Sequence, residues 1–229
     1  MRVPVIFRDV NYPDWDGKPR AGYTIQFDWI AILKWGAEAY FASDPNVFVA
    51  GDHLIYPVEG HPEIRLAPDV YVAFGRPKGH RGSYQVFREG GVFPQVVFEV
   101  WSPNNTLAEM EEKRKFYEKY GAEEYYLVFP DFPAYALGWQ RKEDKLDPVQ
   151  QMNGFVSPRL RFRFSIEKGD LVVYGPDGYP LLRPDEVAVE LNAQRQQAQQ
   201  ERQKAEQEKL RADKLAAKLR ELGLDPDAM

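Results

Sequence analysis

The sequence stretches IRLAPDVYVAF (residues 64–74), PQVVFEVWSPNN (residues 94–105) and EEYYLVFP (residues 123–130) decide the fold of this chain. Each stretch contains a β-branched and aromatic run near proline, glycine or asparagine, which is the pattern of a buried strand. The charged segment 107–120 between the second and third runs has the composition and spacing of a helix. A strand–helix–strand unit of this length favours two parallel strands joined by a crossover helix.

Two carboxylates belong to these buried runs. Asp69 follows a proline and opens the run 70–74, and Glu99 lies inside the run 96–100. A carboxylate in an apolar strand is costly to desolvate unless another group compensates its charge. Two carboxylates on successive strands predict a shared partner. A divalent cation is the natural one, because hard cations such as Mg²⁺ bind carboxylate oxygens.

Phosphodiester cleavage is a reaction that such a pair could support, because a cation held by carboxylates activates water and relieves charge on the phosphate. A nearby ammonium group can stabilise the charge that develops on the phosphate. Lys113 lies on the expected helix and shares a face with Glu109 and Tyr117. The alternative is that Glu99 is a satisfied strand carboxylate that pairs with Lys113 and holds no metal.

A loop rich in positive charge follows the first of the three strands. Residues 75–91 read GRPKGHRGSYQVFREGG, and the basic residues are Arg76, Lys78, His80, Arg81 and Arg88. One interpretation is that they grip the phosphate backbone of a nucleic acid. The other is a solvated loop whose charges keep the protein soluble, and the sequence leaves both open.

The composition of the 229 residues limits the remaining classes of function. A hydrophobic fraction of 44% is sufficient for one sizeable globular domain with an appendage. The absence of cysteine excludes disulfides, thiolate zinc sites and cysteine nucleophiles. The net charge of −5 argues against general coating of nucleic acid, although it allows a local basic groove. No apolar run approaches the roughly 20 residues of a membrane span, and the N-terminus lacks a secretory pattern, so we expect a cytoplasmic protein with no membrane partner.

Further elements are expected on both sides of these runs. Apolar residues at helical spacing predict a helix over residues 28–41, and residues 46–50 and 53–58 have the pattern of a hairpin. Short strands are expected at residues 3–7, 134–141, 160–166 and 171–174.

The composition changes at Pro184, where glutamine, glutamate, arginine, lysine, alanine and leucine begin to dominate. We therefore expect a domain over residues 1–183 and a helical tail over residues 184–229, with the helix ending near Leu222. An apolar heptad seam can be threaded through this helix, although its middle is weak. A coiled coil that makes a homo-oligomer, with a dimer as the expected state, and a solvated helical tail are both open.

The motifs, taken in order, resemble the Uma-two family of restriction-endonuclease-like proteins, a branch of the PD-(D/E)xK nuclease superfamily. The matching residues are Pro68, Asp69, Val70, Glu99, Val100, Trp101, Ser102, Pro103, Lys113, Tyr117, Gly121, Glu124 and Tyr125. The resemblance covers about residues 25 to 175. It implies a mixed α/β fold of the restriction-endonuclease type, in which helices flank a mixed central sheet, here with a long C-terminal helix.

The resemblance also implies an activity, namely metal-dependent hydrolysis of DNA phosphodiester bonds with Mg²⁺ or Mn²⁺ as cofactor. Asp69 and Glu99 would hold the metal together with the backbone carbonyl of Val100. The superfamily motif E-x-K would place a lysine at position 101, where this chain has Trp101. The resemblance therefore assigns the lysine role to Lys113.

Three further residues are accessory candidates on the same basis, namely Glu38, Glu109 and Tyr117. Glu109 stands where the family usually has aspartate, and Ala122 where it usually has valine. The alternative function is a catalytically inactive nuclease-like domain that binds nucleic acid or a protein partner. Retention of the predicted catalytic side chains favours the enzyme. A carbohydrate- or phosphoester-acting enzyme has little support, because the chain has no glycine-rich phosphate loop and no second acidic pair.

Overall fold

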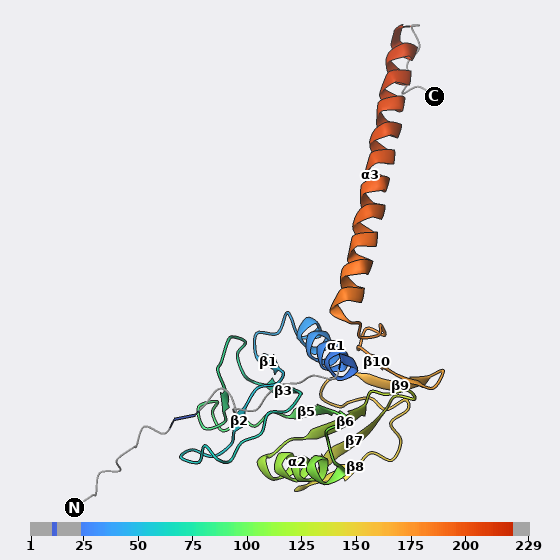
Figure 1. The fold of residues 1–229 in the computed structure, drawn as a ribbon. Helices are drawn as coiled ribbons and strands as arrows, with labels where there is room; N and C mark the ends of the chain where they lie inside the picture. The colour runs from blue at the N-terminus through green and yellow to red at the C-terminus, as the bar shows by residue number, and fades with distance from the viewer. Residues whose placement is uncertain (1–10, 13–23, 222–229) are drawn as a thin grey trace, which may run out of the picture. The chain divides into compact units, whose positions relative to one another are not determined.

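The structure, a computed structural model, describes residues 11–12 and 24–221 (Figure 1). The contacts divide the chain into two units, residues 1–183 and residues 184–229. The strand predicted at residues 3–7 lies outside the described residues. No described helix is long and apolar enough to cross a membrane.

Among the described residues of the first unit, six strands form a central sheet in the order β1-β3-β5-β6-β7-β8. Their bounds are β1 (Val47–Ala50), β3 (Val70–Phe74), β5 (Val96–Val100), β6 (Glu124–Phe129), β7 (Tyr135–Lys142) and β8 (Lys145–Pro148). The central pair β5 and β6 is parallel, and the other neighbours are antiparallel. The predicted mixed α/β class with a mixed central sheet is therefore confirmed.

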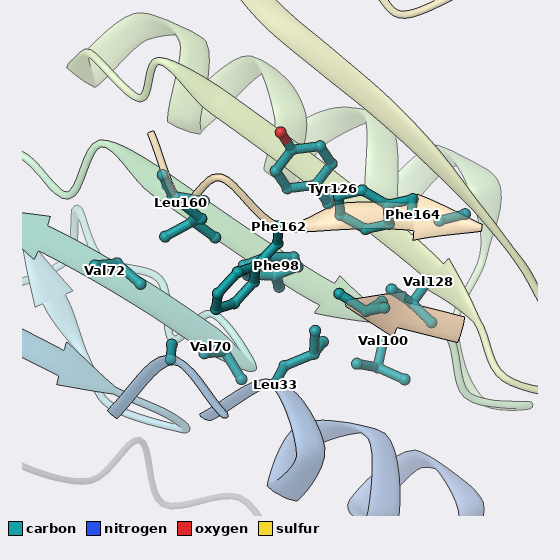
Figure 2. Packing of buried hydrophobic residues seen from close by; sticks show 14 of the residues in the cluster. Leu33, Val70, Val72, Phe98, Val100, Tyr126, Val128, Leu160, Phe162 and Phe164 are labelled. Atoms are coloured by element: carbon teal, nitrogen blue, oxygen red, sulfur yellow. The ribbon is translucent and has the colours of Figure 1, made fainter. Parts of the chain in front are cut away.

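The sheet is covered on both faces. Helix α1 (Thr24–Tyr40) lies on one face and α2 (Leu107–Tyr120) on the other (Figure 1). The α1 face also carries the hairpin of β9 (Arg163–Glu167) and β10 (Asp170–Tyr174). Figure 2 shows Leu33 of α1 beside Val70 and Val100, with Phe164 packed near Tyr126. Because both faces are buried at the centre of the sheet, β3, β5 and β6 are almost continuously apolar.

Local signals fix α2 between β5 and β6. Thr106 caps the helix by accepting the Glu109 N–H at 3.2 Å, and the Glu109 carboxylate accepts the Thr106 N–H at 2.8 Å. This reciprocal capping box satisfies two amides that a helix start leaves unpaired. Gly121 ends the helix in a left-handed conformation, with φ of 106°. The crossover prediction is confirmed, since Val97 pairs with Tyr125 in parallel register.

One strand pairing is wrong, and one predicted strand is present with shifted bounds. Residues 46–50 and 53–58 do not form a hairpin, because β1 pairs with β3 while β2 (Ile55–Tyr56) pairs in parallel with β4 (Tyr84–Gln85). The chain turns away after β1 at Asp52, whose φ is 47° and whose N–H donates to backbone oxygens just before β3. The strand predicted at residues 160–166 begins only at position 163, because Arg161 has a φ of 63° within a turn.

The second unit consists of α3 (Pro184–Glu221), a helix of 38 residues. Its N-terminal turn carries Asp185 and Glu186, and its C-terminal turn carries Lys218 and Arg220. This arrangement complements the helix dipole at both ends. Its large apolar side chains are exposed, namely Val187, Val189, Leu191, Leu210 and Leu215. The structure therefore shows the predicted helix, and the coiled coil stays a prediction.

Candidate active site

The register of β3 and β5 brings the two candidate carboxylates together. Val70 pairs with Phe98, so the residue before β3, Asp69, lies opposite Glu99. Residues directly opposite each other in an antiparallel pair point to the same face of the sheet. This is the face that α2 covers, because Tyr71 and other side chains of the same parity pack with residues of that helix. The carboxylates of Asp69 and Glu99 are thus neighbours beneath α2.

Helix α2 supplies two partners for the Glu99 carboxylate. Lys113 Nζ donates to Glu99 Oε2 at 2.8 Å, and the Tyr117 hydroxyl donates to Glu99 Oε1 at 2.5 Å. The two donors are four residues apart and therefore lie on one side of the helix. Glu99 is only 1% exposed, so these bonds replace the hydration that burial removes.

The electrostatics of the site show an excess of buried negative charge. Burial, together with the charge of Glu99, raises the pKa of Asp69 to about 7, although the Val100 N–H and Lys113 oppose this shift. Burial by itself would lower the pKa of Lys113, but the Glu99 carboxylate outweighs it and the pKa is raised. One ammonium group thus faces two carboxylates, an arrangement in which a bound cation would be stabilising.

The backbone at Val100 contributes two polar groups, and both are bonded to side chains. Its N–H donates to Asp69 Oδ2 at 2.6 Å, and its carbonyl accepts a hydrogen bond from Gln26 Nε2 at 3.0 Å. Gln26 is a site residue that the sequence prediction missed, because the helix was expected to begin at residue 28 and α1 begins at Thr24. Its spacing was a usable signal, since it lies seven residues before the buried Leu33 and so on the same helix face.

Tyr125 places a further polar atom close to the carboxylates. Its hydroxyl is buried and has no hydrogen-bond partner among the described residues. Burial and then the charges of Glu99 and Asp69 raise its pKa, and its ring lies 5.6 Å from that of Tyr117. Buried hydroxyl groups are normally hydrogen-bonded, so this one is suited to an additional partner at the site.

These groups fit a small hard cation. The donor set consists of the carboxylates of Asp69 and Glu99 and the carbonyl oxygen of Val100, which are the ligand types that Mg²⁺ and Mn²⁺ accept. The described residues contain no cluster of three histidine, cysteine, aspartate or glutamate side chains. A cation here would accordingly depend on the carbonyl and on water, which Mg²⁺ characteristically retains as ligands.

The accessory candidates Glu38 and Glu109 have other partners. Glu38 lies 3.8 Å from Lys34 and 3.3 Å from Lys78, and the described residues show no contact between it and the carboxylates of Asp69 or Glu99. The Glu109 carboxylate caps α2, as described above. Both arrangements are those of structural residues.

The basic loop is held largely by its own contacts. Arg81 pairs with Glu89 at 2.6 Å and covers the ring of Phe48 at 4.0 Å, and Arg76 donates to the Glu89 carbonyl at 2.7 Å. The loop's Lys78 pairs with Glu38 of α1. The two remaining basic residues, His80 and Arg88, are exposed. Most of the basic side chains therefore stabilise the conformation of the loop, and two of them are exposed at its surface.

A groove runs along α2 and reaches Lys113. It has a volume of about 630 Å³ and lies between residues 63–66 and α2. Ile64, Met110 and Phe116 give it an apolar lining, and Lys113 contributes the ammonium-bearing chain. Since Lys113 also bonds Glu99, it connects the groove with the buried carboxylates.

The motif residue Glu124 belongs to the opposite face of the sheet. It accepts hydrogen bonds from the Tyr126 hydroxyl at 2.7 Å, the Arg159 N–H at 2.7 Å and the Ser157 hydroxyl at 2.5 Å. Burial raises the pKa of Glu124 despite these donors. Its position identifies it as the anchor of the segment that leads into β9.

The fold and the site together define a nuclease-like α/β domain with a buried carboxylate pair at the sheet. The chain belongs to the Uma2 family, described as "Putative restriction endonuclease", which matches residues 29–166. The chain is also similar to a crystal structure of a "putative nuclease" from Anabaena variabilis, with 11% identity, 63% of this chain and 78% of that chain covered, and a TM-score of 0.45. A comparison with curated proteins found no match.

Proposed function

We propose that this protein is a metal-dependent endonuclease that hydrolyses phosphodiester bonds in DNA. The observation that carries this proposal is the pairing of Asp69 and Glu99 on one face of the sheet, with Lys113 bonded to Glu99 at 2.8 Å. Membership of the Uma2 family supports a nuclease-like function.

Each residue of the site would have a distinct role. Asp69, Glu99 and the Val100 carbonyl would hold Mg²⁺ or Mn²⁺. When bound, such a cation supplies Lewis acidity toward the phosphate and makes water a stronger acid. Asp69 must ionise fully to act as a ligand, and its pKa of about 7 means that cation binding near neutral pH would displace a proton.

Lys113 and Tyr117 would act from the helix side. The Tyr117 hydroxyl fixes one oxygen of Glu99, so that the carboxylate cannot rotate freely. Lys113 keeps its positive charge because Glu99 raises its pKa. Because Lys113 also lines the groove, its ammonium group would stabilise negative charge on a phosphate bound there.

The proposed DNA partner would be engaged beyond the carboxylates by exposed basic side chains. His80 and Arg88 are the residues of the 75–91 loop that remain available at its surface, and a few such contacts to phosphate would make binding sensitive to salt. We further propose that α3 assembles the protein into a homo-dimer, because apolar side chains along it stay exposed in a single chain.

Metal-dependent nicking of supercoiled plasmid tests the proposal. Wild-type protein with Mg²⁺ or Mn²⁺ is expected to nick the plasmid, while Asp69→Asn and Glu99→Gln are expected to lose the activity and remain folded by circular dichroism. Glu111→Gln is the matched control, since Glu111 lies on α2, pairs with Arg114 at 2.8 Å and is not among the residues that line the groove. A folded wild-type protein that nicks no DNA with either metal would contradict the proposal.

A second candidate function is a nuclease-like domain that binds DNA or a partner without cleaving it. The observation in its favour is that Lys113 and Tyr117 satisfy both oxygens of Glu99 without a metal. DNA retention in a mobility-shift assay, without Mn²⁺ binding and without nicking, would support this candidate over the enzyme.

A further inference from the structure

The carbonyl of Val100 lacks a partner in the sheet for a chemical reason. The ladder between β3 and β5 ends at the pair Val70 and Phe98, and Pro68 lies two residues before Val70, where an alternating ladder would need its next N–H donor. Proline has no N–H to donate. The adjacent Trp101 N–H bonds Val128 on the other neighbouring strand, which leaves the polar groups of Val100 directed toward the end of β3.

Both polar groups of Val100 are satisfied by side chains instead of by the ladder. Asp69 Oδ2 accepts the Val100 N–H at 2.6 Å, and Gln26 Nε2 donates to the Val100 carbonyl at 3.0 Å. The Pro68 carbonyl, in turn, accepts the Asp52 N–H at 3.1 Å. The Val100 carbonyl oxygen is therefore held by a side chain of α1 where the ladder has ended.

We propose that Gln26 is a positioning residue, which orients the Val100 carbonyl as an oxygen ligand of the cation site. This inference rests on the proposed function. A carbonyl oxygen has two lone pairs, so it can accept the Gln26 N–H and still offer the second pair to a cation. The carboxamide is neutral, so it orients the carbonyl without adding the charge that a lysine or arginine would bring next to a cation.

Helix α1 gives Gln26 a firm base for this role. Gln26 continues the buried face that includes Leu33 and Ala37, both of which are at most 1% exposed. Ile30 on the same face packs against the core cluster that contains Val100. The donor is therefore fixed by the packing of the helix on the sheet, which is the support that a precise ligand geometry requires.

Binding of Mn²⁺ alone, measured by the electron paramagnetic resonance signal of the free ion, tests the proposal on the full chain. Gln26→Met removes the donor and keeps a similar volume. It is expected to weaken Mn²⁺ binding about two- to tenfold, the range that one hydrogen bond contributes. Gln26→Lys retains an N–H donor but adds positive charge, and it is expected to weaken Mn²⁺ binding more than Gln26→Met does.

Gln95→Met is the matched control. Gln95 makes the corresponding bridge at the opposite end of the same strand pair, where its Oε1 accepts the Phe74 N–H at 2.8 Å. This variant is expected to lower the melting temperature and leave Mn²⁺ affinity unchanged. If wild type binds Mn²⁺ and both Gln26 variants bind it equally well, the positioning role is overturned while the proposed function survives. If wild type binds no Mn²⁺, the proposed function fails and the inference fails with it.

Discussion

Replacement of Lys113 by methionine measures how much the ammonium group contributes to the stability of the fold around the buried carboxylates. Glu99 is 1% exposed, and in Lys113→Met it would keep only the Tyr117 hydroxyl as a donor. Removing one partner of a buried ion pair costs about 3–5 kcal/mol. The Lys113 side chain is 25% exposed, so water lowers this cost, and we expect a loss of about 2–3 kcal/mol in the free energy of unfolding.

The pH dependence of that loss identifies its cause. The charge of Lys113 opposes the rise in the pKa of Asp69, so in Lys113→Met this pKa should lie higher than in the wild type. The folded variant would then resist loss of the Asp69 proton more strongly, so its destabilisation relative to wild type should be larger above neutral pH and smaller at acidic pH, where Asp69 is protonated in both proteins. Denaturant unfolding at pH 8 and at pH 5 measures this difference. In nicking assays the same substitution should slow cleavage on the order of 10²–10³-fold, the effect of losing one charge-stabilising group.

Lys115→Met is the control, because Lys115 lies two residues away on α2 and pairs with Glu112 at 2.8 Å on the exposed side of the helix. Exposed pairs are screened by solvent, so this substitution should change neither stability nor cleavage appreciably. Equal losses of stability in the two variants, or a Lys113→Met penalty that does not vary with pH, would refute the role assigned to the buried pair. Normal cleavage by Lys113→Met would remove the lysine from the mechanism.

Three further predictions follow from other parts of the structure. Because burial raises the pKa of Asp69 to about 7, the folded state binds a proton more tightly than the unfolded chain does. The free energy of unfolding should therefore fall by up to about 4 kcal/mol as the pH rises from about 4 to about 7. Denaturant unfolding at a series of pH values measures this fall, and Asp69→Asn should reduce it. Glu124→Ala should lower stability by about 3 kcal/mol by leaving buried donors unpaired, yet leave Mn²⁺ affinity unchanged in titrations, since Glu124 lies on the opposite face; a change in affinity would contradict this placement. A protein truncated after Arg183 should be a monomer by light scattering, while the full chain should be a dimer. If both proteins have the same number of chains per particle, α3 is excluded as the assembly element.

Local patterns were sufficient to predict the central elements. The strands at 70–74, 96–100 and 124–129 and the helix at 107–120 have the predicted bounds, because continuous burial and capping residues leave clear marks in a sequence. The sequence contains no comparable signal for which strands pair over long range. β1 could equally have paired with the apolar segment that follows it, and its pairing with β3 depends on a turn conformation at Asp52 that the sequence does not announce.

The position of a residue around α1 decides whether its side chain can reach the site. The buried stripe of this helix includes Leu33 and Ala37, and continuing it backwards by whole turns leads to Gln26. Glu38 comes one residue after Ala37 and is therefore rotated by about 100° from the stripe. Its charge made it the more visible candidate, but helix geometry directs it toward Lys34 and Lys78. Side-chain chemistry alone was a poorer guide here than periodicity.

Periodicity also explains why an ammonium group from the helix can replace one from the strand. Position 101 has the same parity as Glu99, so a lysine there would point to the α2 face of the sheet. Trp101 occupies that place and stacks on Phe129 at 5.3 Å, which fills the space with an apolar ring pair. Because α2 crosses over the same face, Lys113 reaches Glu99 from above instead. A positive charge therefore lies beside the carboxylate, supplied by the helix instead of by the strand.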